Sequence, residues 1–197
     1  MTLAGDDVVA RLLAGDESAF VELINAYHER LVRFAATFVR DWSAAEDVVQ
    51  DTWIAVLRGI EGFERRSSLQ TWLFGICANQ ARTAYTRQVR AVPVDTSGPT
   101  IDPARFAPDR SWADPPDPWD DVDARLDAAG LLPIVQSAID ALPDPQRQVV
   151  TLRDVEGLTS KDVCTVLDIS DVNQRVLLHR GRARVRRALE EKLGGRE

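Results

Sequence analysis

The chemistry available to this sequence is concentrated in its arginines. Six of them lie close together near the C-terminus with no acidic residue among them: Arg175, Arg180, Arg182, Arg184, Arg186 and Arg187. Guanidinium groups bind phosphate oxygens and form bidentate hydrogen bonds to the edge of guanine. An acidic protein gains little from gathering this much positive charge unless a polyanion binds it. The tail therefore predicts a surface that binds nucleic acid.

A second acid-free segment covers residues 65–90. It contains five arginines and no carboxylate, interleaved with serine, threonine, asparagine and glutamine. These side chains bond phosphates and base edges, and Trp72, Phe74 and Tyr85 offer rings on which unpaired bases could stack. Trp72 lies on the apolar stripe of a predicted helix, where a tryptophan more often belongs to the core than stacks on a base. A solvated surface normally mixes both signs of charge, so the segment favours a second nucleic-acid contact.

The net charge of the chain, −7, conceals both basic segments. Residues 1–90 hold ten basic and twelve acidic side chains, and residues 131–197 hold eleven and ten. Residues 91–130 hold three arginines against nine aspartates, together with seven of the ten prolines. Proline and aspartate at this density oppose regular structure, and so long an irregular stretch is unusual inside one domain. We expect two domains, 1–90 and 131–197, joined by an acidic, irregular linker at 91–130.

Both predicted domains have the periodicity of amphipathic helices. Apolar residues recur at steps of three and four, and alternating strand patterns are absent. Asp16 or Ser18 could cap the first long helix. The spacing predicts helices at residues 8–13, 20–38, 48–57, 69–81, 131–142 and 145–155, before the arginine-rich tail. The expected fold is all-α, with two small helical bundles.

The tail itself follows a helix-turn-helix pattern. Thr159 can cap a first helix, with Asp162 returning the capping-box bond. Ser170 can cap a second helix after a turn at Asp168 and Ile169. In this arrangement the second helix enters the major groove of DNA. If residue 168 adopts a left-handed backbone conformation at this turn, the conformation costs more free energy for aspartate than it would for glycine.

An acidic face is predicted on the helix that contains residues 48–57. Asp47, Gln50, Asp51 and Ile54 fall on one side of this helix. An isolated row of charges is most often a solvated surface. Acidic and amide groups beside an exposed apolar residue also suit a basic helical partner.

Enzymatic and metal-binding patterns are missing from the sequence. There is no Walker loop and no dinucleotide-binding glycine pattern. His28 and His179 lie near no plausible ligand cluster, so we expect no catalytic residue, no metal and no cofactor. Cys77 and Cys164 read as small buried residues. The apolar runs are too short for membrane insertion and the N-terminus lacks signal-peptide features, so we expect a cytoplasmic protein.

Two motifs, in this order, resemble a known family. EDVVQDTWIAVLRGI, followed by FERRSSLQTWLFGICANQARTAYTRQ, is similar to the second conserved domain of bacterial sigma factors of the extracytoplasmic-function group. LPDPQRQVVTLRDVEGLTSKDVCTVLDISDVNQRVLLHRGRARVRRAL is similar to their fourth domain. The resemblance covers about residues 20–90 and 131–190.

The resemblance implies a role for each part of the chain. Asp47, Gln50 and Asp51 would bind the β′ clamp helices of core RNA polymerase, and the β flap is a further expected contact on the polymerase. The loop at 64–68 would capture a flipped base of the −10 element, and the following helix would read that element. The −10 candidates are Arg65, Arg66, Ser67, Ser68, Gln70, Asn79, Arg82 and Arg87. The −35 candidates, on a helix that would enter the major groove, are Asp171, Asn173, Gln174, Arg175, His179, Arg180 and Arg182.

The recognition helix departs from the family pattern at two positions. Gln174 stands where the family has a small apolar residue, and Leu177 stands where it often has a basic one. Val172, Val176 and Leu178 would then supply the inward face. The rotation of this helix, and with it the set of side chains that meet bases, stays open at the level of sequence.

The sequence thus predicts a sigma factor that binds core RNA polymerase and directs promoter-specific transcription initiation. An anti-sigma factor is a possible partner in this family. In the family the linker enters the RNA channel of the polymerase, and an acidic linker suits a basic channel. The alternative is a stand-alone helix-turn-helix regulator with an N-terminal helical sensor or interaction domain. A helical adaptor protein would leave the C-terminal arginines unexplained.

Overall fold

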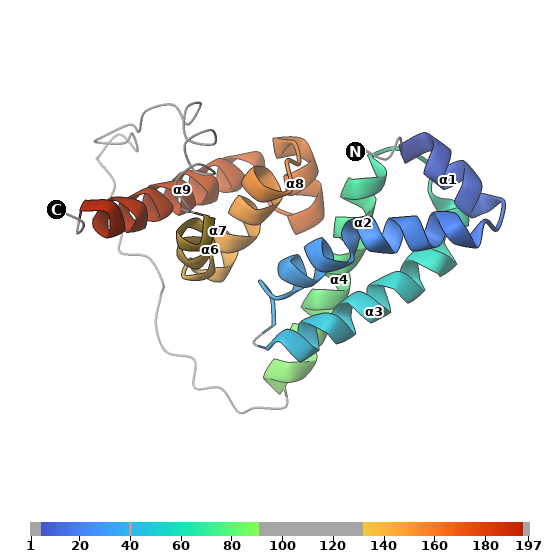
Figure 1. Ribbon diagram of the computed structural model, residues 1–197, viewed down its shortest axis with the longest axis horizontal. Helices are drawn as coiled ribbons and strands as arrows, with labels where there is room; N and C mark the ends of the chain where they lie inside the picture. The colour runs from blue at the N-terminus through green and yellow to red at the C-terminus, as the bar shows by residue number, and fades with distance from the viewer. Residues whose placement is uncertain (1–4, 40, 91–131, 195–197) are drawn as a thin grey trace.

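The computed structural model describes residues 5–39, 41–90 and 132–194. All regular structure within these ranges is helical, which confirms the predicted all-α class. The predicted linker at 91–130 lies outside the described residues. Figure 1 shows one group of helices, α1 to α4 in blue to green, beside a second group, α6 to α9 in yellow to red.

The first bundle contains the predicted polymerase-binding face and the acid-free segment at residues 65–90. Its helices are α1 (Gly5–Leu13), α2 (Glu17–Ala35), α3 (Trp42–Gly59) and α4 (Leu69–Arg90), with a 3-10 turn, η1 (Ile60–Gly62), after α3. Their apolar stripes face one another, as the three-and-four spacing requires. The largest side chains that the bundle buries completely include Leu23, Leu31, Phe34, Leu73 and Phe74.

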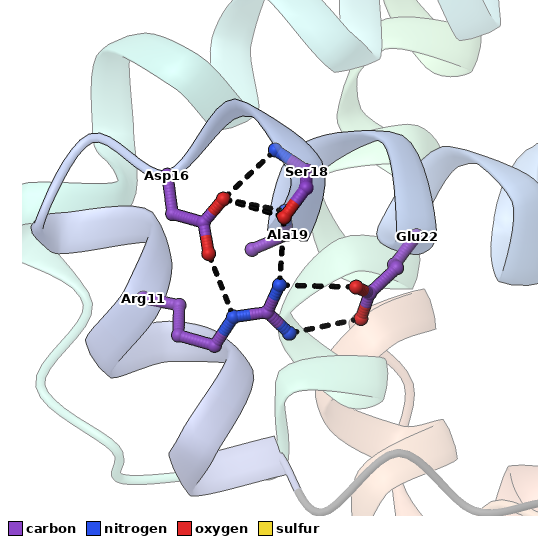
Figure 2. A network of polar contacts seen from close by, with 5 residues as sticks. All are labelled: Arg11, Asp16, Ser18, Ala19 and Glu22. Atoms are coloured by element: carbon purple, nitrogen blue, oxygen red, sulfur yellow. Dashed lines mark hydrogen bonds and ion pairs between the residues drawn. The ribbon is translucent and has the colours of Figure 1, made fainter.

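A network of polar contacts holds α1 against the start of α2 (Figure 2). The carboxylate of Asp16 accepts the backbone N–H of Ser18 at 2.9 Å and the Ser18 hydroxyl at 2.6 Å. Arg11 donates to Asp16 at 2.8 Å and, through two nitrogens, to Glu22 at 3.0 Å. These bonds, foremost the one from the Ser18 hydroxyl, lower the pKa of Asp16 to about 2. Of the two cap residues that the sequence left open, Asp16 is the N-cap of α2.

The second bundle contains the predicted DNA-reading tail. It comprises α6 (Leu132–Asp140), α7 (Asp144–Val150), a π-helical turn η4 (Thr151–Val155), α8 (Ser160–Leu167) and α9 (Asp171–Gly194). The predicted helix at 145–155 is therefore divided into two pieces: the α-helix α7 and the π-helical turn η4. The recognition segment and the arginine tail form one continuous helix, α9.

The predicted helix-turn-helix is present in α8 and α9. The Thr159 hydroxyl oxygen accepts the backbone N–H of Asp162 at 3.2 Å, and the hydroxyl donates to the Asp162 carboxylate at 2.6 Å. The Ser170 hydroxyl accepts the N–H of Asn173 at 3.2 Å, so Ser170 caps α9. Asp168, in the turn, has φ 54° and ψ 50°, which is the left-handed region that favours glycine.

The two bundles share one apolar core. Leu158, Val163 and Val166 of the second bundle belong to the same buried cluster as Phe34 and Phe74 of the first. Helices α4 and α8 lie against each other at the boundary, as Figure 1 shows. Sequence reasoning predicted both bundles but not this contact, because periodicity shows that a helix face is buried without showing what covers it.

Within the second bundle, α9 approaches α7 closely at Gly181. A Cβ atom at this position would lie 2.6 Å from Cγ2 of Val150 and 3.6 Å from Cβ of Gln146. A valine side chain has few rotamers with which to move away. The missing side chain therefore permits the two helices to pack.

Gly181→Ala should lower the free energy of unfolding by roughly 1–2 kcal/mol, because the methyl group must displace Val150. Gly75→Ala is the matched control: Gly75 also lies inside a helix, and a Cβ atom there would meet no atom within 4 Å. Stability should rise by up to about 1 kcal/mol in the control, through helix propensity. Urea unfolding followed by circular dichroism measures both variants, and equal stabilities would contradict the close approach at Gly181.

Candidate nucleic-acid interface

The loop before α4 presents two arginines and caps the helix. Arg65 and Arg66 are exposed, and Arg65 has a φ of 56°, which is uncommon for a residue with a side chain. Arg66 forms an exposed ion pair with Glu64 at 2.8 Å. Ser67 is half-buried. The Ser68 hydroxyl oxygen accepts the backbone N–H of Thr71 at 3.0 Å, which gives this predicted DNA contact a role as the cap of α4.

The predicted reading residues of α4 divide into two pairs. Asn79 and Arg87 are exposed to solvent. Gln70 and Arg82 instead reach the second bundle: Gln70 donates to the carbonyl of Glu156 at 2.8 Å, and Arg82 donates to the carbonyl of Val166 at 3.0 Å. Half of the predicted −10 face of α4 therefore contacts the other bundle.

The aromatic rings of this segment have different environments. Phe74 is completely buried in the core, and Trp72 packs against Phe63 with ring centroids 5.0 Å apart. Tyr85 is exposed on α4. Phe74 cannot stack on a base in this fold, because it lies inside the apolar cluster. Tyr85 is the ring of the three that is open to solvent.

The predicted polymerase-binding face is exposed along α3. Asp47, Gln50 and Asp51 all face solvent. Two large apolar side chains on the same helix, Ile54 and Leu57, are 47% and 54% exposed. Carboxylates beside uncovered apolar side chains are typical of a surface that binds a basic, partly apolar helix.

The start of the recognition helix presents a different set of side chains from the predicted one. Asp171, Asn173 and Arg175 are exposed, and Arg175 pairs with Asp171 at 2.7 Å. Val172, which the sequence placed on the inward face, is 71% exposed. Gln174, predicted among the DNA contacts, is completely buried, and neither polar atom of its amide has a hydrogen-bond partner among the described residues. The helix is therefore rotated so that Val172 faces outward and Gln174 faces the core.

The later −35 candidates are partly enclosed. His179 and Arg180 are half-buried. Burial, followed by the charges of Arg186, Arg180 and Arg182, lowers the pKa of His179, so its ring is neutral at neutral pH. Arg182 binds both carboxylate oxygens of Asp154, at 3.0 and 2.5 Å, and the bond to Asp154 raises the pKa of Arg182. In this fold Arg182 holds η4 against α9.

The described residues offer no metal centre or membrane helix. Within them, no three His, Cys, Asp or Glu side chains are placed to hold a metal ion. Burial raises the pKa of Cys77 to about 12, so this thiol stays protonated. No helix in the described ranges is long and apolar enough to cross a membrane.

Comparison with known proteins matches both bundles to one family. Residues 23–91 match the family model for sigma-70 region 2, and residues 132–185 match the model for sigma-70 region 4. The RNA polymerase sigma-H factor of Pseudomonas aeruginosa is 29% identical over 93% of this chain and 92% of its own length. The ECF RNA polymerase sigma-E factor of Haemophilus influenzae is 29% identical over 97% of this chain and 96% of its own length. The chain belongs to the extracytoplasmic-function (ECF) sigma factors.

A solved sigma-factor structure has the same fold. The sigma factor RpoE of Bartonella quintana, in complex with the anti-sigma factor NepR, is 21% identical with a TM-score of 0.59. The match covers 87% of this chain and 96% of that one. In this sigma factor, region 2 covers α3 and α4 with most of α2, and region 4 covers α6 to α8 with the first part of α9.

Because the rotation of α9 buries the amide of Gln174, substitution of this residue should change the stability of the protein. Gln174→Leu should raise the free energy of unfolding by roughly 1–3 kcal/mol, because it replaces a buried amide that has no hydrogen-bond partner by an apolar group of similar size. Asn173→Leu, one position away and exposed, should change stability by less than about 0.5 kcal/mol. Urea unfolding of both variants provides the comparison. A Gln174→Leu protein that is less stable than the parent would show that the amide is satisfied in solution.

Proposed function

We propose that this ECF sigma factor binds core RNA polymerase through the exposed face of α3 and directs initiation by reading promoter DNA with both bundles. The proposal is supported chiefly by the occurrence, in one chain and in order, of an acidic and apolar α3 face, a basic region 2 helix and a basic helix-turn-helix. The protein itself performs no catalytic chemistry in this proposal. It would act in the cytoplasm, where the core enzyme transcribes.

The α3 face would bind the clamp helices of the β′ subunit. Asp47 and Asp51 would pair with basic side chains on those helices, while Ile54 and Leu57 would bury apolar surface. The region 4 bundle would contact the β flap. An anti-sigma factor would compete for these surfaces, and family membership makes such a partner an expectation.

Region 2 would bind the −10 element as unpaired DNA. Arg65 and Arg66 project from the loop before α4, where they can pair with phosphates on both sides of a flipped base. Asn79, Arg82 and Arg87 would hold the strand along α4, and Tyr85 offers a stacking surface. Capture of unpaired bases offsets the free energy of unstacking them, which is a few kcal/mol per base.

Region 4 would read the −35 element with the exposed start of α9. The N-terminal residues of a recognition helix are the ones that reach base edges. Asn173 can bond adenine and Arg175 can bond guanine, whereas Val172 can only make apolar contact, for which the methyl group of thymine is the available partner. Gln174 is assigned no base contact, because its amide lies in the core.

Run-off transcription with purified core polymerase, on promoters selected from random DNA, tests the function. Asp51→Arg should weaken core binding at least about tenfold, because it places like charges together. Arg175→Ala should weaken promoter binding by about tenfold while core binding stays intact. Core affinity is measured by fluorescence anisotropy and promoter affinity by gel shift of the holoenzyme.

Three outcomes would contradict parts of the proposal. Absence of both core binding and promoter-directed product would exclude sigma activity. DNA binding by the isolated protein, unaffected by polymerase, would favour the stand-alone helix-turn-helix regulator. Equal loss of core binding in Asp51→Arg and Arg175→Ala would contradict the division of roles.

The proposed contact of Val172 can be tested one methyl group at a time. Replacing single thymines of the −35 element by deoxyuridine removes only the C5 methyl group. At one position the loss should weaken binding by roughly fourfold, the equivalent of about 0.8 kcal/mol for one buried methylene-sized group. In Val172→Ala the same replacement should have a much smaller effect. If Val172→Ala responds to deoxyuridine at every position as the parent does, Val172 does not read thymine.

A further inference from the structure

We propose that a cleft between the two bundles binds a small aromatic carboxylic acid. The cleft has a volume of about 220 Å³. At about 30 Å³ per molecule this is room for about seven waters, which suits a ligand built on a single aromatic ring. The side chains assigned above to polymerase and to promoter DNA do not line the cleft. The site is therefore separate from the surfaces of the proposed function.

Both bundles contribute to the walls of the cleft. Ala36, just beyond the end of α2, and Trp42, at the start of α3, belong to region 2. Ile139 of α6 and Val155 of η4 belong to region 4. Arg147 of α7 also lines the cleft, and it donates to the carbonyl of Ala36 at 3.3 Å, which links the two walls. A ligand in the cleft would therefore contact both bundles.

The apolar part of the lining favours an aromatic ring. Trp42 is 55% exposed and Val155 is 49% exposed, although both line a concave site. The indole N–H of Trp42 donates to the carboxylate of Glu46 at 3.1 Å, which holds one edge of the indole and leaves more than half of the side chain uncovered. Uncovered apolar side chains in a concave site are typical of a ligand pocket. A flat aromatic ring can stack on an indole, which an aliphatic chain cannot do.

Two charged groups in the lining already have close partners of opposite charge. Arg30 binds the carboxylate of Glu156 at 2.6 Å, and the Glu156 side chain is 1% exposed. Arg147 pairs with Asp144 at 2.9 Å. These pairs cancel most of the charge that Glu156 and Arg147 would present to a ligand.

Arg33 has the longest ion pair among the residues that line the cleft. Its guanidinium lies 3.7 Å from the carboxylate of Glu29, and the two side chains are 46% and 86% exposed. An exposed pair of this length contributes little stability, so a ligand carboxylate could replace Glu29. One guanidinium can donate two parallel hydrogen bonds to a carboxylate. Arg33 therefore favours an acidic ligand over a neutral one.

Asp140 limits the charge of that ligand. Its carboxylate accepts a hydrogen bond at 3.0 Å from the amide of Gln136, which is neutral and does not cancel the negative charge. A ligand with two negative charges, such as a phosphate monoester, would be repelled more strongly than one with a single negative charge. The lining therefore fits a monocarboxylate better than a phosphate.

Binding in the cleft would stabilise the arrangement in which its two walls meet, because the ligand needs both. The consequence for transcription rests on the proposed function. If region 2 and region 4 read separate promoter elements, a ligand that ties the bundles together lowers promoter-directed transcription. The binding itself requires no part of the proposed function.

Isothermal titration calorimetry of the full chain with cinnamate tests the site. One cinnamate should bind per chain. Cinnamamide, which has the same ring without the charge, should bind about tenfold or more weakly, because a hydrogen bond to a charged group is lost. Phenyl phosphate, which carries close to two negative charges at neutral pH, should also bind more weakly than cinnamate.

Substitutions in the cleft have matched controls outside it. Arg33→Gln should weaken cinnamate binding about tenfold, whereas Arg58→Gln, also exposed but outside the cleft, should not change it. Trp42→Ala should weaken binding about tenfold through loss of stacking. Leu13→Ala, at a side chain that is 50% exposed outside the cleft, should bind like the parent. If circular dichroism shows that Trp42→Ala loses helix, Val155→Glu adds a like charge to the cleft and should weaken binding instead.

Several results would overturn the proposal. Unchanged affinity in both Arg33→Gln and Trp42→Ala, or equal affinity for cinnamate and cinnamamide, would exclude an aromatic acid in this cleft. Tighter cinnamate binding after Trp112→Ala with Trp119→Ala would show that tryptophans of the chain itself compete for the cleft, which would overturn a free acid as its occupant.

Run-off transcription tests the consequence for initiation. Saturating cinnamate should lower the product made with the parent and leave the product made with Arg33→Gln unchanged. An unchanged parent, with cinnamate bound, would overturn the effect on transcription and leave the site in place. Calorimetry uses no polymerase, so absence of binding contradicts the site whether or not run-off transcription succeeds.

Discussion

The charge of Glu156 is buried between the two bundles, and the arrangement of the molecule depends on its neutralisation there. Arg30 supplies the opposite charge from α2. The segment that carries Glu156 also brings its carbonyl to Gln70, and the preceding turn η4 brings Asp154 to Arg182. Apolar burial is not directional, so the shared core alone would allow several orientations of region 4. An ion pair that must be buried with good geometry permits far fewer.

Helix ends provide a second constraint, because each leaves backbone groups without partners. The carbonyl at the end of α8 accepts Arg82, and the carbonyls beyond α2 accept Arg147 and Gln148. The donors best suited to capping such ends are also suited to holding phosphates, since both sites are rich in acceptor oxygens. A basic surface of this kind is therefore also able to bind the helix ends of its own chain.

The recognition helix shows how packing can override a familiar pattern. Gly181 permits α9 to approach α7, and that approach places Gln174 in the interior and leaves Val172 exposed at the end that would face DNA. A buried amide without a partner is unfavourable, yet rotating it outward would bring other residues of α9 into the core. Which side chains α9 exposes at its start is thus a consequence of how this helix packs on α7.

The sequence by itself determined the all-α class, the helix-turn-helix and its caps, and the two basic segments. These features are local: helical periodicity repeats within four residues, and a cap such as Ser170 acts within three. Only the tertiary structure decided the rotation of α9, because arginines occur around that helix and weaken its apolar periodicity. It alone also decided the pairing of Arg30 with Glu156, since residues 126 positions apart leave no local signal of their contact. Features of the site that lie within a single helix could be predicted from the sequence. Contacts between the two bundles could not.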